Sequence, residues 1–185
     1  MVKISPLITA ALSDAAAVVR ARYYLRSAQA VGPRVRLWGT PIVRNNGKLL
    51  IGDRVRLASE VSTLELSVGS GGTLQIGDRV LINHGCSLGA TKLIRIGDGC
   101  NIGTQSILID NAFHELHPAR RNECPAAEPV ILEDNVWLAA RVIVLPGVTI
   151  GRNSVIGAGS VVTRDIPPNV LAAGIPAKVI RPLPA

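Results

Sequence analysis

Residues 132–164 read LEDNVWLAARVIVLPGVTIGRNSVIGAGSVVTR, and within this stretch an aliphatic residue recurs at every sixth position. The residue that follows each aliphatic is usually glycine, alanine or a small polar residue. The residue four places after it is small or β-branched. The recurring aliphatics are Leu132, Leu138, Val144, Ile150, Ile156 and Val162, and the residues four places on are Val136, Val142, Val148, Ser154 and Ser160. A repeat of six residues therefore decides the fold.

The same spacing extends towards the N-terminus in shorter runs. These runs are Val31, Leu37 and Val43; Ile51 and Leu57; Ile76, Ile82 and Leu88; and Ile96, Ile102 and Leu108. A period of two would mark an ordinary strand and a period of 3.6 an amphipathic helix. A period of six fits a coil that turns a corner every six residues, with each aliphatic pointing inward. Because one coil cannot bury its aliphatics alone, stability comes from stacking of successive coils.

The composition agrees with many short strands joined by turns. Hydrophobic residues make up 48% of the 185 residues but aromatic residues only 3%, and the chain contains 18 Gly and 12 Pro. Valine and isoleucine favour strands, whereas glycine and proline favour turns. The length predicts one domain with a substantial core. These features exclude a helix bundle.

Charge and cysteine content restrict the partners. The net charge of +7 favours an anionic partner, such as nucleic acid, a phosphorylated cofactor or an anionic membrane. No basic stripe with stacking aromatics supports nucleic-acid binding. Three cysteines without a CxxC spacing predict neither disulfides nor a zinc site, and Cys86 and Cys100 fall where the repeat requires a small buried residue. We expect a cytoplasmic protein, because no signal peptide or membrane-spanning segment is evident.

Residues 1–30 form a separate element. Ile8, Leu12, Ala16, Val19 and Tyr23 are spaced as on one face of a helix, which Gly32 and Pro33 are expected to end. We expect this helix to cap the open end of the coil stack. A peripheral contact with the inner face of the membrane is the alternative.

The repeats resemble the hexapeptide-repeat acyltransferases, and the resemblance covers residues 31–181. The stretch DNVWLAARVIVLPGVTIGRNSVIGAGSVVTRDIPPNVLAAGIPAKVIRPL is the most specific part and is similar to the galactoside, maltose and polysaccharide O-acetyltransferases. The resemblance implies an all-β fold, a left-handed parallel β-helix shaped as a triangular prism over residues 31–170. It also implies an inserted loop at 109–129, a C-terminal tail at 171–185 that helps to bind coenzyme A, and a homotrimer.

The inserted loop interrupts the repeat with the sequence DNAFHELHPARRNECPAAE. Asp110 and His114 match the family pattern D-x-x-[FT]-H, which assigns His114 as the catalytic base and leaves His117 off the motif. Neutral imidazole accepts a hydroxyl proton near neutral pH. Asp110 and Glu115 are both candidates to orient the imidazole or to bind the acceptor. A metal held by Cys124 with the two histidines is not expected, because the spacing fits no zinc motif.

Further site residues follow from the resemblance. Asn83 stands where the repeat prefers a small residue, and either Asn83 or Gly85 corresponds to an asparagine of the family's acceptor and transition-state pocket. A turn asparagine is the alternative for Asn83, and a surface residue is the expectation for His84. The residues that match the family's coenzyme A groove between two subunits are Trp137, Ala140, Ala158, Thr163, Arg164, Lys178 and Arg181. A core tryptophan is the alternative for Trp137.

The resemblance therefore predicts an enzyme that moves an acetyl group from acetyl-CoA to a hydroxyl of a sugar or polysaccharide precursor. Transfer is expected to be direct, in a ternary complex, because no activated nucleophile is evident. A xenobiotic acetyltransferase of the same fold is an alternative. A non-catalytic β-helix that serves as a binding or assembly module is another.

Overall fold

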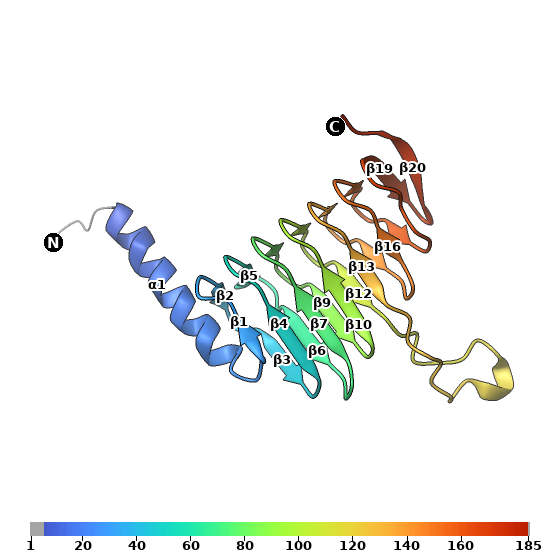
Figure 1. The fold of residues 1–185 in the computed structure, drawn as a ribbon, viewed down its shortest axis with the longest axis horizontal. Coiled ribbons are helices and arrows are strands. Elements are labelled where there is room, and N and C mark those ends of the chain that lie inside the picture. The colour runs from blue at the N-terminus through green and yellow to red at the C-terminus, as the bar shows by residue number, and fades with distance from the viewer. Residues whose placement is uncertain (1–5, 185) are drawn as a thin grey trace.

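The computed structural model describes the backbone of residues 6–184 and the side chains from residue 13 to residue 184. The chain winds into a stack of triangular coils, each built from three short strands (Figure 1). Successive coils place equivalent strands side by side in three parallel sheets. The parallel β-helix that the repeat and the resemblance predict is therefore confirmed.

The three sides of the prism are named here sheets A, B and C, in the order in which the chain visits them. Sheet A holds β1 (Ala30–Val31), β4 (Lys48–Ile51), β7 (Thr73–Ile76), β10 (Leu93–Ile96), β13 (Val130–Leu132) and β16 (Thr149–Ile150). Sheet B holds β2 (Arg36–Gly39), β5 (Arg56–Ser59), β8 (Leu81–Ile82), β11 (Asn101–Ile102), β14 (Trp137–Leu138), β17 (Val155–Ile156), β19 (Val170–Gly174) and β20 (Ala177–Pro182). Sheet C holds β3 (Ile42–Asn45), β6 (Glu65–Val68), β9 (Ser87–Ala90), β12 (Ile107–Ile109), β15 (Ile143–Val144) and β18 (Val161–Val162). All pairings are parallel except that of β19 with β20.

The core consists of the two columns that the repeat predicts. The aliphatics from Leu132 to Val162 are all fully buried, as are the small residues that follow them by four places. Val31 and Val43 are only partly buried, because they lie in the first coil at the open end of the prism. A column of aliphatics on each of three converging sheets fills the interior without aromatic residues.

Cys86 and Cys100 belong to the small-residue column and are buried, as predicted. Their Sγ atoms donate to the carbonyls of Gly103 and Glu133 in the next coil, each at 3.1 Å. Ser106 Oγ makes the same kind of bond to the carbonyl of Ala139 at 3.2 Å. These thiols therefore pack and hydrogen-bond as serine equivalents.

This burial makes the protein less stable at alkaline pH. Burial raises the pKa of Cys86 and of Cys100 from the usual 9.0 to about 11, so the folded state keeps protons that the unfolded chain releases. The thiol contribution to stability is complete below pH 9 and is lost as the pH rises towards 11. The loss is at most about 2–3 kcal/mol per thiol. In urea unfolding at pH of about 8 and about 10.5, the variant Cys86→Ser/Cys100→Ser should lose less stability than the parent. An equal loss would contradict the prediction.

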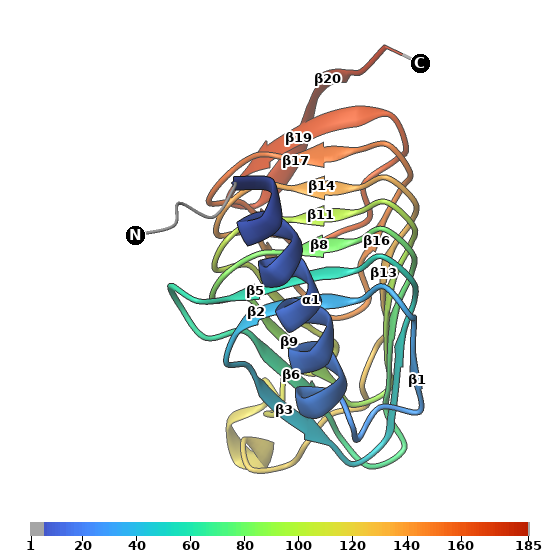
Figure 2. The same ribbon diagram turned by 90° about the vertical axis from the view of Figure 1, so that its left-hand side faces the viewer.

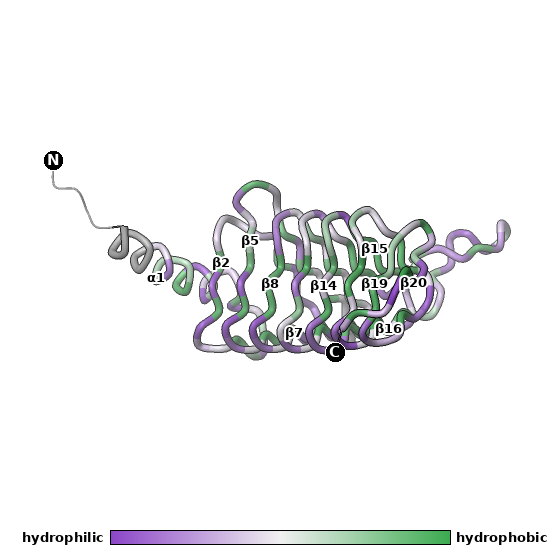
Figure 3. Tube along the Cα trace, turned by 90° about the horizontal axis from the view of Figure 1, so that it is seen from above, coloured by the Kyte–Doolittle hydropathy of each residue, from purple (hydrophilic) through white to green (hydrophobic). Residues whose placement is uncertain are grey.

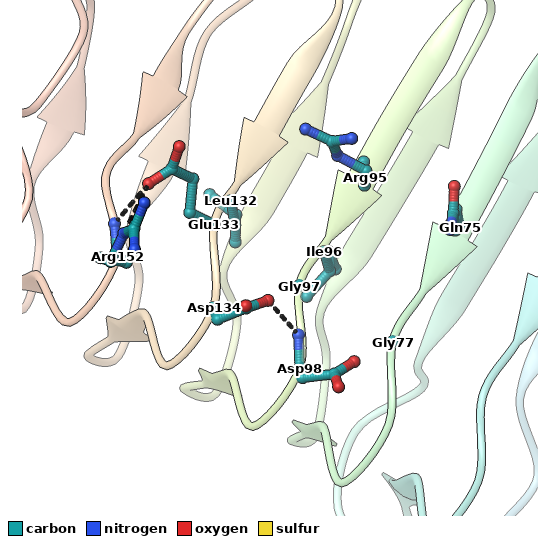
Figure 4. A pocket seen from close by; sticks show the side chains of 10 residues that line it. All are labelled: Gln75, Gly77, Arg95, Ile96, Gly97, Asp98, Leu132, Glu133, Asp134 and Arg152. Carbon is teal, nitrogen blue, oxygen red and sulfur yellow. Dashed lines mark hydrogen bonds and ion pairs between the residues drawn. The ribbon is translucent and has the colours of Figure 1, made fainter.

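A ladder of aspartates holds the coils in register at the corner between sheets A and B. Each carboxylate accepts a backbone N–H of the preceding coil at 2.8–2.9 Å, and in three of the four cases this is the N–H of the equivalent aspartate. The ladder runs through Asp53, Asp78, Asp98 and Asp134, and Figure 4 shows the step from Asp134 to Asp98. The Arg34 guanidinium also binds Asp53 and holds the pKa of that carboxyl below its usual value.

Helix α1 (Pro6–Tyr24) lies across the open end of the first coil and projects past it (Figures 1 and 2). It ends at Tyr24, earlier than the predicted stop at Gly32 and Pro33, because the turn that follows returns the chain to β1. Ala17 and Ala21 are its buried residues, and Leu25 just beyond it is buried as well. An ion pair of 3.1 Å between Asp14 and Arg36 ties the helix to β2.

The apolar residues that stand at helical spacing in the sequence do not form the buried face of this helix. Val19 and Tyr23 are 70% and 62% exposed, and Ala16 is exposed as well. The side chains of Ile8 and Leu12 lie outside the described residues. The small alanines lie against the first coil because they allow the helix axis to approach it closely, and the larger apolar residues face outward. No helix in the described part of the chain is long and apolar enough to cross a membrane.

Candidate functional site

The loop that carries His114 leaves the prism at the corner between sheets C and A. It connects β12 with β13 and extends well beyond the coils on both sides of it (Figures 1 and 3). Its root is buried, because Asp110 and Asn111 are 0% and 2% exposed. The rest of the loop is mostly exposed, so its shape depends on hydrogen bonds rather than on a core.

The loop folds back on itself. Glu115 N donates to the carbonyl of Glu123 at 3.0 Å, which joins its two arms. The Arg120 guanidinium lies between two carboxylates, 2.8 Å from Glu123 and 3.6 Å from Glu115. At the tip, a single turn η1 (Pro118–Arg120) begins with His117, whose Nδ1 accepts from Ala119 N at 3.2 Å. His117 therefore serves as a cap of this turn.

His114 is exposed on the first arm, and its ring is held by the second. Its Nδ1 lies 2.8 Å from the backbone carbonyl of Arg121. A carbonyl oxygen only accepts hydrogen bonds, so this contact places the proton on Nδ1 and leaves the lone pair on Nε2. An oriented neutral imidazole with a free Nε2 can take a proton from a hydroxyl group. The orienting group is thus neither Asp110 nor Glu115, the two candidates that the sequence offered.

Asn111 sets the position of His114 from the root of the loop. Its Oδ1 accepts from Phe113 N at 2.6 Å, and its Nδ2 donates to the carbonyl of Pro125 at 3.2 Å. Phe113 has a φ of 61°, in the left-handed region that residues other than glycine rarely adopt. The Asn111 side chain stabilises this turn and links the two ends of the loop. Asn111 was not predicted as a site residue, although an asparagine two residues before a turn is a known turn signal.

Asp110 has a different environment from the one that the resemblance implies. It is fully buried, and its carboxylate accepts three backbone N–H groups, from Thr91 at 2.8 Å and from Lys92 and Leu93 at 2.7 Å each. These bonds fix the turn between β9 and β10. A carboxylate with no exposed surface does not reach an acceptor in this structure.

Asn83 lies at another corner, where the chain turns from sheet B to sheet C after β8. Its Oδ1 accepts from His84 N at 3.0 Å, which leaves its Nδ2 as a donor. His84 Nδ1 accepts from Val61 N at 3.4 Å, and Gly85 has a φ of 68°. Because His114 leaves the prism at the corner between sheets C and A, the two predicted site residues do not meet within one chain.

The residues predicted to bind coenzyme A lie on the outer face of sheet B, at these same two corners and on β20. Trp137 is 52% exposed on the outer face of sheet B, beside a hollow of about 380 Å³ that also borders Leu81 and Asn101. Trp137 is therefore not a core tryptophan. Ala140 and Ala158 follow at the corner between sheets B and C, in adjacent coils joined by the bond from Gly159 N to the Ala140 carbonyl at 2.9 Å.

The remaining predicted residues lie in the last coils. Thr163 and Arg164 follow β18 and are exposed near the corner between sheets C and A. Lys178 and Arg181 are exposed on β20, which returns antiparallel to β19 and places Arg181 opposite Leu171. Sheet B therefore ends in the basic strand β20, beyond the corner that carries Ala140 and Ala158.

A larger polar groove of about 400 Å³ lies at the aspartate ladder, between sheets A and B (Figure 4). It is lined by Arg95, Asp98, Asp134 and Arg152 among others, and its carboxylates already bind backbone N–H groups. None of the predicted site residues borders it. Within the described residues, no three His, Cys, Asp or Glu side chains are grouped so that they could hold a metal ion.

Comparisons with known proteins agree with this geometry. The family model of the bacterial transferase hexapeptide (six repeats) matches residues 129–164. The galactoside O-acetyltransferase of Escherichia coli strain K12 is 41% identical over 111 residues, which are 60% of this chain and 55% of the relative. The chain spans about half the length of the curated relatives that it matches.

Solved structures match over more of the chain. A hexapeptide-repeat-containing acetyltransferase from Vibrio cholerae, complexed with acetyl coenzyme A, is 26% identical with a TM-score of 0.66, and the match covers 98% of this chain and 91% of that one. A galactoside acetyltransferase in complex with coenzyme A is 31% identical with a TM-score of 0.62, over 89% of this chain and 70% of that one. With its coils, its interrupting loop and these similarities, the chain belongs to the hexapeptide-repeat acyltransferase family, within which it is similar to the galactoside O-acetyltransferases.

Proposed function

We propose that this protein is an acetyl-CoA-dependent O-acetyltransferase whose acceptor is a hydroxyl of a sugar or polysaccharide precursor. The observation that carries the proposal is the contact between His114 Nδ1 and the Arg121 carbonyl, which leaves Nε2 free to act as a base. The similarity to a galactoside O-acetyltransferase and to a galactoside acetyltransferase in complex with coenzyme A supports the donor and the acceptor class.

In the proposed mechanism, His114 Nε2 takes the proton of the acceptor hydroxyl as its oxygen attacks the thioester carbonyl carbon. The Arg121 carbonyl remains bonded to Nδ1–H and stabilises the imidazolium that forms. Asn83 Nδ2 is a donor for the developing oxyanion. The C–S bond then breaks, the new ester C–O bond remains, and His114 returns its proton to the departing thiolate.

Several surface features support coenzyme A binding by the predicted residues. Alanines 140 and 158 leave room along the corner between sheets B and C, and Trp137 borders an open apolar hollow beside them. At Gly157 an added Cβ would lie 2.8 Å from the Cβ of Ala173. A larger residue is therefore disfavoured there, and no side chain projects from this part of the surface. Lys178 and Arg181 would bind phosphate groups of the donor through charge-assisted hydrogen bonds.

A trimer would complete the site. Asn83, Ala140 and Ala158 lie at one corner of the prism, whereas His114 and Arg164 lie at another. A second copy that presents its corner between sheets C and A to the first copy's corner between sheets B and C would join the two groups. Three such contacts close a ring by threefold symmetry. Light scattering should therefore give three times the chain mass of 19.5 kDa, and a monomer would leave the site incomplete.

The activity is tested by release of free thiol from acetyl-CoA in the presence of galactosides, oligosaccharides and aminoglycoside or amphenicol antibiotics as acceptors. We expect acetyl ester formation on a sugar hydroxyl, detected by mass spectrometry. Turnover with the antibiotics alone would favour the xenobiotic alternative. If no acceptor in the panel stimulates thiol release and acetyl-CoA does not bind, the proposal is wrong.

Cofactor binding should depend on the basic tail. Replacing Arg164, Lys178 and Arg181 by glutamine should raise the KM for acetyl-CoA at least about ten-fold, because charge-assisted bonds to phosphate are lost. The effect should be smaller with dephospho-CoA, which lacks the 3′-phosphate. The matched control replaces Lys92, Arg95 and Arg152 by glutamine, which removes the same charge from sheet A and its edge. An equal KM in the two variants would show that the groove is misplaced.

A further inference from the structure

Helix α1 has two apolar faces, of which the prism covers one. Ala17 and Ala21 are buried against the first coil. On the opposite face, Val19 and Tyr23 are 70% and 62% exposed, and Ala16 is exposed beside them. A helix that is apolar on both sides is normally covered on both. Figures 1 and 3 show that this helix projects from the end of the prism, so the coils do not cover its outer face at Val19 and Tyr23.

The positive charge of the protein is concentrated at the same end. Residues 1–59 contain ten Lys and Arg but only two Asp and no Glu, whereas residues 60–185 contain ten Lys and Arg and eleven Asp and Glu. The whole net charge of +7 therefore arises from the helix and the first coils. Seven of these basic residues are exposed, and four of them, Arg22, Arg26, Arg44 and Lys48, lie on the helix, just after it, or on the strands β3 and β4.

The exposed aromatic and basic groups of this end lie together. The Arg26 guanidinium carbon is 4.8 Å from the centroid of the Tyr23 ring, and the Tyr23 and Tyr24 rings meet edge to face at 5.1 Å. Arg22 and Arg26 also donate to the backbone carbonyls of Val31 and Tyr23, at 3.2 Å and 2.9 Å. The Arg26 charge is therefore held beside the Tyr23 ring of the outer apolar face, whereas Arg22 is anchored to the first strand of sheet A.

We propose that this end of the protein docks on the surface of an anionic phospholipid bilayer. Val19 and Tyr23 would enter the interfacial region, where aromatic and aliphatic side chains of surface helices are buried. The basic residues Arg22, Arg26, Arg44 and Lys48 would bind lipid phosphates, with a contribution of about 1 kcal/mol each near such a surface. This inference is independent of the proposed activity, because none of these residues belongs to the candidate site.

Charge complementarity favours a bilayer over the other occupants of this face. A second copy would bring an equally basic end against the first, and like charges disfavour that contact. Nucleic acid or an acidic polysaccharide would neutralise the arginines but would leave the apolar ridge of Val19 and Tyr23 uncovered. An anionic bilayer satisfies both features.

The test is flotation of the full-length protein with vesicles of phosphatidylcholine alone, or with about one-third phosphatidylserine, in about 0.1 M and about 0.5 M salt. We expect binding to the anionic vesicles that weakens at high salt, and little binding to the neutral ones. Replacing Arg22, Arg26, Arg44 and Lys48 by glutamine should lower the partition coefficient at least about ten-fold. The matched control replaces Arg79, Lys92, Arg95 and Arg152, which removes four charges from the central coils and should change the partition little.

A second variant, Val19→Ser/Tyr23→Ser, separates the occupants. Weaker vesicle binding at unchanged oligomeric mass is the expected result. If this variant binds vesicles as the parent does, binding is purely electrostatic and the docking proposal is wrong. The proposal is equally wrong if the oligomeric mass falls, since the face then contacts a second copy, or if the parent binds neither kind of vesicle. Catalytic turnover in the absence of vesicles does not enter this test.

Discussion

The variant His114→Ala is expected to lower kcat by roughly two to four orders of magnitude, which is the usual contribution of a positioned general base. The hydrogen bond at His114 Nδ1 orients the ring and leaves Nε2 free to act as the base. Thermal unfolding, oligomeric mass and binding of coenzyme A should not change, because the loop lies outside the stacked core. Steady-state kinetics on the parent and the His114→Ala variant measure the effect, and the oligomeric mass of both is checked in parallel.

The matched control is His117→Ala, which removes a histidine three residues away in the same loop. His117 Nδ1 is occupied by the N–H of Ala119, so its role is to cap the single turn at the loop tip. We expect a loss of kcat of no more than a few-fold, from a slightly looser tip. A dead His117→Ala variant beside an active His114→Ala variant would mean that the base is misassigned. Full activity in both would exclude general-base catalysis from this loop.

The repeat predicted the fold because each period of six residues corresponds to one side of a triangular coil. The aliphatic residues at every sixth position from Leu132 to Val162 point into the prism. Because many positions share this pattern, a few exceptions such as Val31 and Val43 do not obscure it. The aspartate ladder went unnoticed, although its signal is in the sequence. The pairs Gly52–Asp53, Gly77–Asp78 and Gly97–Asp98 recur at the same point of the repeat, where a carboxylate can reach the preceding coil.

The site was only partly predictable, because its decisive contacts involve the backbone. The residue type and the motif indicate His114, but a carbonyl such as that of Arg121 leaves no mark in a sequence. The buried face of the helix is not evident from spacing, for a related reason. Spacing identifies the larger apolar side of α1, whereas close packing against the first coil selects the smaller one, with Ala17 and Ala21.

The family motif marks Asp110 as a site residue, whereas its contacts in the structure are those of a residue that stabilises the fold. Of the substitutions predicted to affect stability, replacement of Asp110 should produce the largest loss. In Asp110→Ala, the N–H groups of Thr91, Lys92 and Leu93 lose their acceptor inside the protein. Breaking such a buried charged network typically costs about 3–5 kcal/mol. Urea unfolding followed by circular dichroism should show this loss in the free energy of unfolding.

Two controls define what the Asp110 result means. Asp110→Asn should be nearly as destabilised, because its amide has one acceptor oxygen and turns an NH₂ group towards a backbone donor. Asp165→Ala removes one exposed bond, from Thr149 N at 2.7 Å, and should cost only about 0.5–1.5 kcal/mol. If Asp110 instead binds the acceptor, as the family resemblance implies, Asp110→Ala would unfold like the parent and would raise the KM for the acceptor alone. The buried carboxylate and its three backbone donors lead us to expect the loss of stability.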